Sequence, residues 1–188
     1  NFTKADCVLN GNEVISAEKQ SEINQIVLRL QNNEPIQYIT GKGYFFGYEF
    51  KVTPNTLIPR PETEELVDWV LTEMKKQPNK NWRVLDIGTG TGCIPITIKK
   101  EYGNSEVSAI DVSKEALVVA KENAQLLNAE VTFIEKDILP YVKQLIPSTT
   151  IFSYSFETLS EDTTSKYEAR VKQIICNGNL SCVAGIAY

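Results

Sequence analysis

The stretch Leu85-Asp86-Ile87-Gly88-Thr89-Gly90-Thr91-Gly92 decides the fold of this 188-residue chain. It begins inside an apolar run, residues 82–87, which predicts a buried strand. Residues 93–102 predict a helix, because Pro95 falls in the first turn, where a missing N–H costs little. Alternating glycines between strand and helix let the chain turn tightly and let a ligand approach the backbone. A glycine-rich turn without a ligand is the alternative, although three such glycines are costly where nothing has to approach.

The alternation of strand and helix continues after the glycines. Residues 106–111 predict a second strand, a helix follows with Ser113 as its N-cap, and residues 131–134 predict a third strand. Because strands and helices alternate, we expect right-handed crossovers and parallel strands, with helices on both faces of the sheet. The sequence therefore predicts an α/β fold.

Two carboxylates follow the second and third strands. Asp111 comes about twenty residues after the glycines, where a carboxylate can accept both hydroxyls of a ribose. The alternatives are a solvated strand-end acid or a cap for the helix that starts at Ser113. Asp137 is placed to bind an adenine amino group, with Ile138 packing on the purine, unless Asp137 is simply exposed. All these loops follow parallel strands at their carboxyl ends, where open α/β sheets bind ligands.

The glycine spacing separates two classes of adenosine-containing cofactor. Dinucleotide enzymes favour Gly-x-Gly-x-x-Gly, with the third glycine one place later than Gly92. The spacing Gly88-x-Gly90-x-Gly92, preceded by Asp86, is the form seen in methyltransferases. An NAD-dependent oxidoreductase is therefore disfavoured.

The residues before the first strand of the sheet predict smaller elements. Residues 16–32 predict an amphipathic helix with Ser16 as its N-cap, and the helix ends before Pro35 because the residue preceding a proline is pushed out of the helical region. Aromatic and β-branched residues over 36–52 predict a β-hairpin with Gly47 at or near its turn. Three prolines then fix an irregular segment. Residues 62–76 predict an amphipathic helix whose inward face is Leu66, Val67, Val70 and Leu71.

Composition excludes several kinds of chemistry. The chain has no histidine, so Ser-His-Asp and Cys-His sites are impossible, and its four cysteines form no C-x-x-C pair for zinc. A net charge of −5 argues against a protein whose main task is to grip nucleic acid. No apolar run approaches membrane-spanning length. We expect a cytoplasmic protein with reduced thiols and no metal.

At the level of longer segments the chain resembles the HemK/PrmC family, the release-factor glutamine methyltransferases. The resemblance covers about residues 2–139, and five features carry it: residues 34–41, the hairpin at 46–50, residues 57–64, the glycine stretch at 85–92, and Asp111. Residues 58–63, with the sequence Ile-Pro-Arg-Pro-Glu-Thr, are the most family-specific.

The resemblance implies a class I methyltransferase, with an incomplete Rossmann-like parallel sheet preceded by a helix and a β-hairpin linker. Residues 1–34 would end a helical N-terminal domain, 35–60 would be the hairpin and Pro-rich linker, and 61–139 the S-adenosylmethionine-binding domain. Residues 140–188 are unassigned. The substrate would be the glutamine of the Gly-Gly-Gln tripeptide in class 1 release factors.

The resemblance also implies site residues. Cofactor contacts would fall on Gly88, Thr89, Gly90, Thr91, Gly92, Asp111 and Ile138, and the sequence pattern adds Asp137. Arg60 and Glu62 would line the substrate entrance, or else form a local ion pair that braces the proline-rich turn. The family's catalytic Asn-Pro-Pro-Tyr motif does not occur, and no catalytic residue is identified. A cofactor-binding fragment without activity and a nucleic-acid amino-group methyltransferase are the alternative functions.

Overall fold

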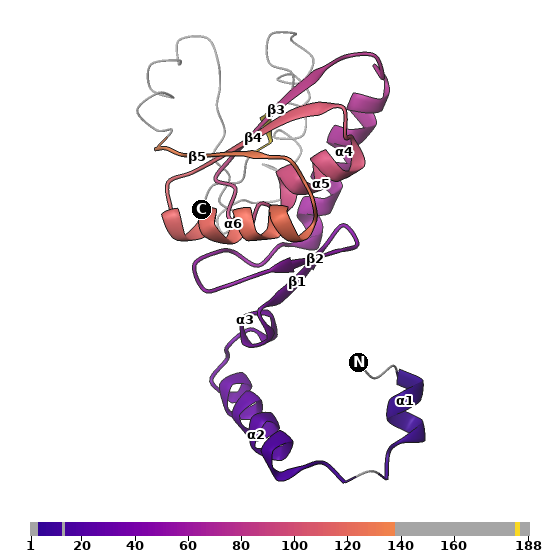
Figure 1. The fold of residues 1–188 in the computed structure, drawn as a ribbon, viewed down its shortest axis with the longest axis vertical. Helices are drawn as coiled ribbons and strands as arrows, with labels where there is room; N and C mark the ends of the chain where they lie inside the picture. Colours follow the sequence, from indigo (N-terminus) through magenta and orange to yellow (C-terminus); the bar gives the residue numbers. More distant parts are fainter. Residues whose placement is uncertain (1–3, 13, 138–182, 185–188) are drawn as a thin grey trace, which may run out of the picture. The chain divides into compact units, whose positions relative to one another are not determined.

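The computed structural model describes residues 4–12, 14–137 and 183–184 (Figure 1). The chain divides into two compact units, Asn1–Thr40 and Gly41–Tyr188. Apart from a two-residue strand, residues 140–188 lie outside the described residues, as does Ile138. Within the described residues no helix has both the length and the apolar character needed to cross a membrane.

The first unit is helical. The predicted helix is α2, Ala17–Gln31, and its N-cap is Ser16, whose hydroxyl accepts a hydrogen bond from the Lys19 N–H at 3.3 Å. The helix ends at Gln31 with Asn32 as its C-cap, and Asn33 then adopts a left-handed φ of 60° before Pro35. Helix α1, Lys4–Leu9, precedes it and was not predicted.

The expectation of strand structure at the start of residues 36–52 is wrong. Ile36–Thr40 form the short helix α3. The N–H of Ile39 donates to the Pro35 carbonyl at 3.2 Å, and the Thr40 hydroxyl donates to the Ile36 carbonyl at 2.9 Å. Proline favours the start of a helix because its φ is already helical and its absent N–H would have no partner there.

The predicted hairpin forms after Gly41, in the second unit. Strand β1, Lys42–Phe45, pairs antiparallel with β2, Tyr48–Lys51. Phe46 and Gly47 make the turn with φ of 51° and 79°, the two positive values that a type I′ turn requires, which confirms Gly47 at the turn. The Phe46 N–H donates to the Glu64 carboxylate at 3.0 Å, so the hairpin packs within the second unit.

The predicted parallel sheet is confirmed. It contains β3 (Trp82–Ile87), β4 (Ser105–Asp111), β5 (Thr132–Glu135) and the two-residue β6 (Val183–Ala184), in the order β5-β4-β3-β6. All neighbouring strands are parallel. The strand order reverses at β3, the first of the four along the chain. In open α/β sheets, ligands bind beside such a reversal, outside the carboxyl ends of the strands.

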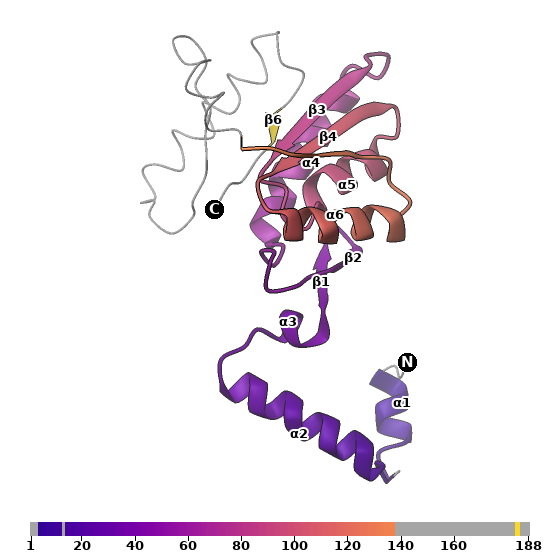
Figure 2. The same ribbon diagram turned by 60° about the vertical axis from the view of Figure 1, so that its left-hand side comes forward.

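Three helices accompany the sheet (Figure 2). They are α4 (Pro61–Lys75), α5 (Cys93–Glu101) and α6 (Lys114–Leu126). Helix α5 packs on β3 and β4 and also contacts both α4 and α6. The predicted inward face of α4 is buried at Val67, Val70 and Leu71, whereas Leu66 is only partly buried. This packing fixes the start of α5 at the end of β3.

Candidate functional site

The glycine-rich loop lies across the end of the neighbouring strand β4. The N–H groups of Gly88 and Thr89 both donate to the Ile110 carbonyl, at 2.8 and 3.1 Å. Gly88, Gly90 and Gly92 have φ of 75°, 54° and 78°, in the left-handed region that side chains disfavour. Each glycine therefore has a conformational reason to be there.

The loop glycines differ in their surroundings. Among the described residues, a Cβ at Gly90 would meet no atom within 4 Å, so this position faces open space there. A Cβ at Gly92 would lie 3.0 Å from the Ile96 Cδ1 and 3.1 Å from the Ala120 Cβ. Gly92 thus lets α5 pack closely on α6, whereas Gly90 has no such packing role. The sequence predicted ligand approach for all of them.

We expect alanine at these two glycines to have unequal effects on folding. Gly92→Ala should lower the free energy of unfolding by about 3 kcal/mol, because backbone strain of about 1 kcal/mol adds to overpacking of about 2 kcal/mol. Gly90→Ala should cost only the strain, about 1 kcal/mol. Urea denaturation of both variants measures the difference. Equal losses would contradict the packing role of Gly92.

Asp111 joins the glycine loop to helix α6. One carboxylate oxygen accepts the Gly90 N–H and the other accepts the Ser113 N–H, each at 2.9 Å. The helix itself is capped by the Ser113 hydroxyl, which accepts the Ala116 N–H at 3.1 Å. A carboxylate has about four acceptor positions, so Asp111 keeps capacity for two further donors, as a ribose would need.

The loop after β5 also lies beside the end of β4. The Lys136 N–H donates to the Asp111 carbonyl at 3.0 Å, which brings the chain after β5 beside the end of β4. Asp137 follows and its side chain is exposed. Thr89 and Thr91, within the same glycine-rich loop, are both buried. The structure therefore brings together the three loops that the sequence predicted to meet.

Asp86 was noted in the motif but not predicted as a site residue. Its side chain is fully buried, and neither carboxyl oxygen has a partner in hydrogen-bonding geometry among the described residues. Burial raises the pKa of Asp86 to about 7; the nearby Thr89 hydroxyl opposes the rise without meeting hydrogen-bond geometry, and the charge of Asp111 adds to it. Such a carboxyl is suited to a cationic ligand. The sequence signal that could have identified Asp86 is an acidic residue inside an otherwise apolar strand.

Arg60 and Glu62 lie at the start of α4. Arg60 is the half-buried residue before the first turn, and its carbonyl accepts the Thr63 N–H at 3.0 Å. Glu62 is exposed in the first turn, where a negative charge favours the helix dipole. Their predicted place at a substrate entrance stays a prediction.

The described residues offer little other chemistry. They contain no group of three or more His, Cys, Asp or Glu side chains that could hold a metal ion. Cys93 is buried at the start of α5, and burial raises the pKa of its thiol to about 12. A thiol that stays protonated is a poor nucleophile. Within the described part of the chain, this site therefore offers carboxylates and main-chain groups.

Comparison with known families identifies the class. The methyltransferase domain family matches residues 78–183, and the PrmC N-terminal domain family matches residues 1–41. The first match spans more than half of the chain, so the chain belongs to the methyltransferase family.

Individual relatives narrow the resemblance. The chain is 47% identical over 137 residues to the release factor glutamine methyltransferase of Flavobacterium psychrophilum, covering 72% of this chain and 48% of the relative. It is 47% identical over 133 residues to the one from Bacteroides thetaiotaomicron, covering 71% and 46%. The chain thus spans about half the length of these relatives. The resemblance predicted from the sequence is confirmed.

Solved structures of methyltransferases are also similar, and one of them serves as an example. The SAM dependent methyltransferase from Agrobacterium tumefaciens is 23% identical and has a TM-score of 0.46, over 55% of this chain and 34% of that one.

Proposed function

We propose that this chain binds S-adenosylmethionine at the glycine-rich loop and is part of an enzyme that methylates class 1 release factors. The acceptor would be the side-chain amide of the glutamine in their Gly-Gly-Gln tripeptide. The observation that carries the proposal is the Asp111 carboxylate, held against the Gly90 N–H at the carboxyl edge of a parallel sheet. The names of the relatives support the choice of substrate.

The residues present fit this cofactor. Asp111 has acceptor capacity left for ribose hydroxyls, and Gly90 faces open space. Asp86 is a buried carboxyl without a described partner, which suits the positive charges of the cofactor. When bound, S-adenosylmethionine supplies a methyl group already activated by its sulfonium. The chain's own task is then to bind and orient, which is where positioning contributes most to rate.

The acceptor makes a further demand. An amide nitrogen is a poor nucleophile because its lone pair is delocalised into the carbonyl, so oriented acceptors for its N–H groups are needed. The family supplies them from Asn-Pro-Pro-Tyr, and no Asn-Pro pair occurs in these 188 residues. This observation favours a second candidate, a chain that binds the cofactor without transferring the methyl group.

Methyl transfer and cofactor binding, measured separately, decide between these functions. We expect calorimetry to detect binding of S-adenosylhomocysteine, because its adenosine keeps every contact proposed for Asp111 and Gly90. The chain is then incubated with a class 1 release factor and methyl-labelled cofactor, with a Gln→Ala release factor as the control. Label confined to the Gly-Gly-Gln peptide supports the enzyme, and binding without transfer supports the second candidate. No binding at millimolar cofactor would refute both.

A nucleic-acid amino-group methyltransferase is the less favoured alternative. The net charge of −5 provides no excess of Lys and Arg to neutralise phosphates. Tight DNA binding that weakens steeply with salt would revive it. A release-factor substrate also places the protein in the cytoplasm, as part of the same proposal.

A further inference from the structure

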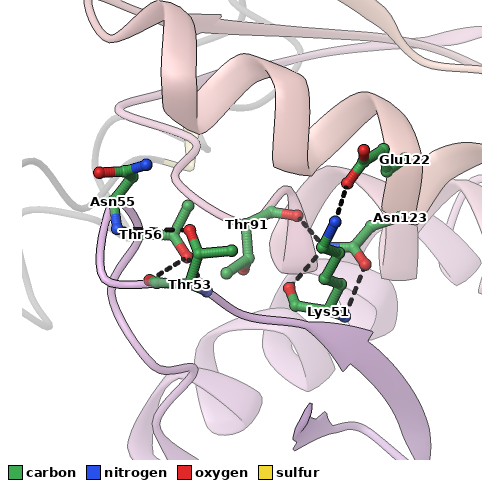
Figure 3. Close-up of polar contacts among 7 residues, drawn as sticks. All are labelled: Lys51, Thr53, Asn55, Thr56, Thr91, Glu122 and Asn123. Carbon is green, nitrogen blue, oxygen red and sulfur yellow. Dashed lines mark hydrogen bonds and ion pairs between the residues drawn. The ribbon is translucent and has the colours of Figure 1, made fainter. Parts of the chain in front are cut away.

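A buried asparagine on α6 connects the hairpin to the glycine-rich loop. The Asn123 side chain is 0% exposed. Its oxygen accepts the Lys51 N–H at 2.7 Å, and its nitrogen donates to the Lys51 carbonyl at 3.0 Å and to the Thr91 carbonyl at 2.9 Å. Figure 3 shows the Asn123 amide between Lys51 and Thr91. Both amide hydrogens and the oxygen are therefore used.

The hydrogen bonds to Lys51 satisfy the main chain at the edge of β2 that does not pair with β1. Val52 donates its N–H to the Gly41 carbonyl at 3.0 Å, toward β1, so the main-chain groups of Lys51 face the other way. Asn123 pairs with both of them, much as one residue of an added strand would. Without Asn123 both main-chain groups of Lys51 would lose these partners, and a main-chain group that stays buried without a partner costs about 1–3 kcal/mol.

The hydrogen bond from the Asn123 amide to the Thr91 carbonyl lies at the candidate cofactor site. Thr91 lies between Gly90, whose N–H donates to Asp111, and Gly92, which packs on α6. A donor on the Thr91 carbonyl therefore holds the middle of the glycine-rich loop. Because Asn123 is on α6, it fixes that loop relative to the hairpin.

The hairpin in turn contacts the proline-rich segment. A Cβ at Gly43 would lie 2.9 Å from the Val52 Cγ1 and 3.3 Å from the Pro59 Cδ, so β1 and Pro59 approach closely. After Val52 the chain makes a turn in which the Thr56 N–H donates to the Thr53 carbonyl at 2.9 Å (Figure 3). The segment anchored in this way leads directly to Arg60.

We propose that Asn123 is a positioning residue that holds the cofactor loop and the proline-rich segment in one arrangement. The inference rests on the proposed function for its ligand, but the clamp itself is a property of the free chain. It predicts that cofactor binding stiffens the hairpin through Asn123, and that loss of the amide loosens both Lys51 and the glycine-rich loop together.

The test compares Asn123→Ala with a neighbouring control. Glu122→Gln removes the exposed ion pair that the Lys51 Nζ makes at 2.7 Å but leaves the main-chain clamp intact. We expect Asn123→Ala to weaken S-adenosylhomocysteine binding roughly tenfold, the effect of one lost hydrogen bond of ordinary strength. Glu122→Gln should bind like the parent chain, because exposed ion pairs contribute little.

Hydrogen exchange separates positioning from general destabilisation. Without cofactor, Asn123→Ala should speed exchange at residues 42–52 and 88–92 and leave α4 unchanged. With cofactor, the parent chain and Glu122→Gln should gain protection at 42–52, and Asn123→Ala should not. If Asn123→Ala does not fold, the parent chain alone still tests the inference, because bound cofactor must then protect residues 42–52 as well as 88–92, and protection confined to 88–92 would overturn it.

A folded variant that keeps both the affinity and the hairpin protection of the parent chain would overturn the inference. Exchange that rises equally in every element would overturn it too. If the parent chain does not bind the cofactor, the proposed function fails while the cofactor-free exchange still decides the role of Asn123.

Discussion

Asp111→Ala is expected to weaken binding of S-adenosylmethionine by about 100-fold. The variant removes the proposed acceptor for two ribose hydroxyls, and hydrogen bonds to a charged group contribute about 1.5–3 kcal/mol each. It also takes away the acceptor that holds the Gly90 N–H at 2.9 Å, so the loop should lose its arrangement before the ligand arrives. A loss of about 3 kcal/mol corresponds to about 100-fold in affinity. Calorimetric titration with S-adenosylhomocysteine, whose adenosine makes the same proposed contacts, measures this loss of affinity.

Glu135→Ala provides the matched control. Glu135 is the register partner of Asp111 at the end of β5 and is exposed, with Lys114 at 3.6 Å. Its removal changes the net charge by the same amount at the same edge of the sheet, so binding should stay within about twofold. Unchanged affinity in a folded Asp111→Ala variant would disprove the assigned role. Equal losses of affinity in both variants would show that Asp111 acts only through its charge at long range.

Asp86→Asn should abolish most of the pH dependence of folding stability between pH 4 and 7. Burial raises the pKa of Asp86 to about 7 in the folded chain, against 3.8 for the unperturbed group. The folded chain therefore holds a proton that the unfolded chain has released, and the free energy of unfolding falls as pH rises through this window. About three pKa units at 1.36 kcal/mol each amount to about 4 kcal/mol. The contribution is complete below pH 4 and lost above pH 7.

Urea denaturation at several pH values measures this slope. The variant should be more stable than the parent chain at pH 8, because it has no buried charge to form. Glu106→Gln, which removes an exposed carboxylate on β4, should keep the parent slope. If the free energy of unfolding of the parent chain rises from pH 4 to 7, the ionised Asp86 carboxylate must have a stabilising partner in the folded chain. Cofactor at saturation should flatten the slope, because a bound cation favours the ionised carboxyl.

Local patterns predicted most of the described fold. Period-two and period-3.6 spacings of apolar residues gave the bounds of β3 and placed α4 within one residue at each end. The N-caps Ser16 and Ser113 were correct because capping involves only neighbours in sequence. The same local reasoning failed at α3, where aromatic and β-branched residues suggested strand but Pro35 started a helix.

The sequence by itself determined the parallel sheet, the glycine-rich loop at the end of β3 and the acid at the end of β4. These follow from periodicity, turn chemistry and the order of elements along the chain. Only the tertiary structure decided that Gly90 faces open space while Gly92 packs on Ala120, and that Asp86 is buried without a described partner. It also decided that Asn123 reaches Lys51, 72 residues away. The physical reason is that burial and long-range hydrogen bonds depend on which surfaces meet, and residue spacing along one element does not record its neighbours.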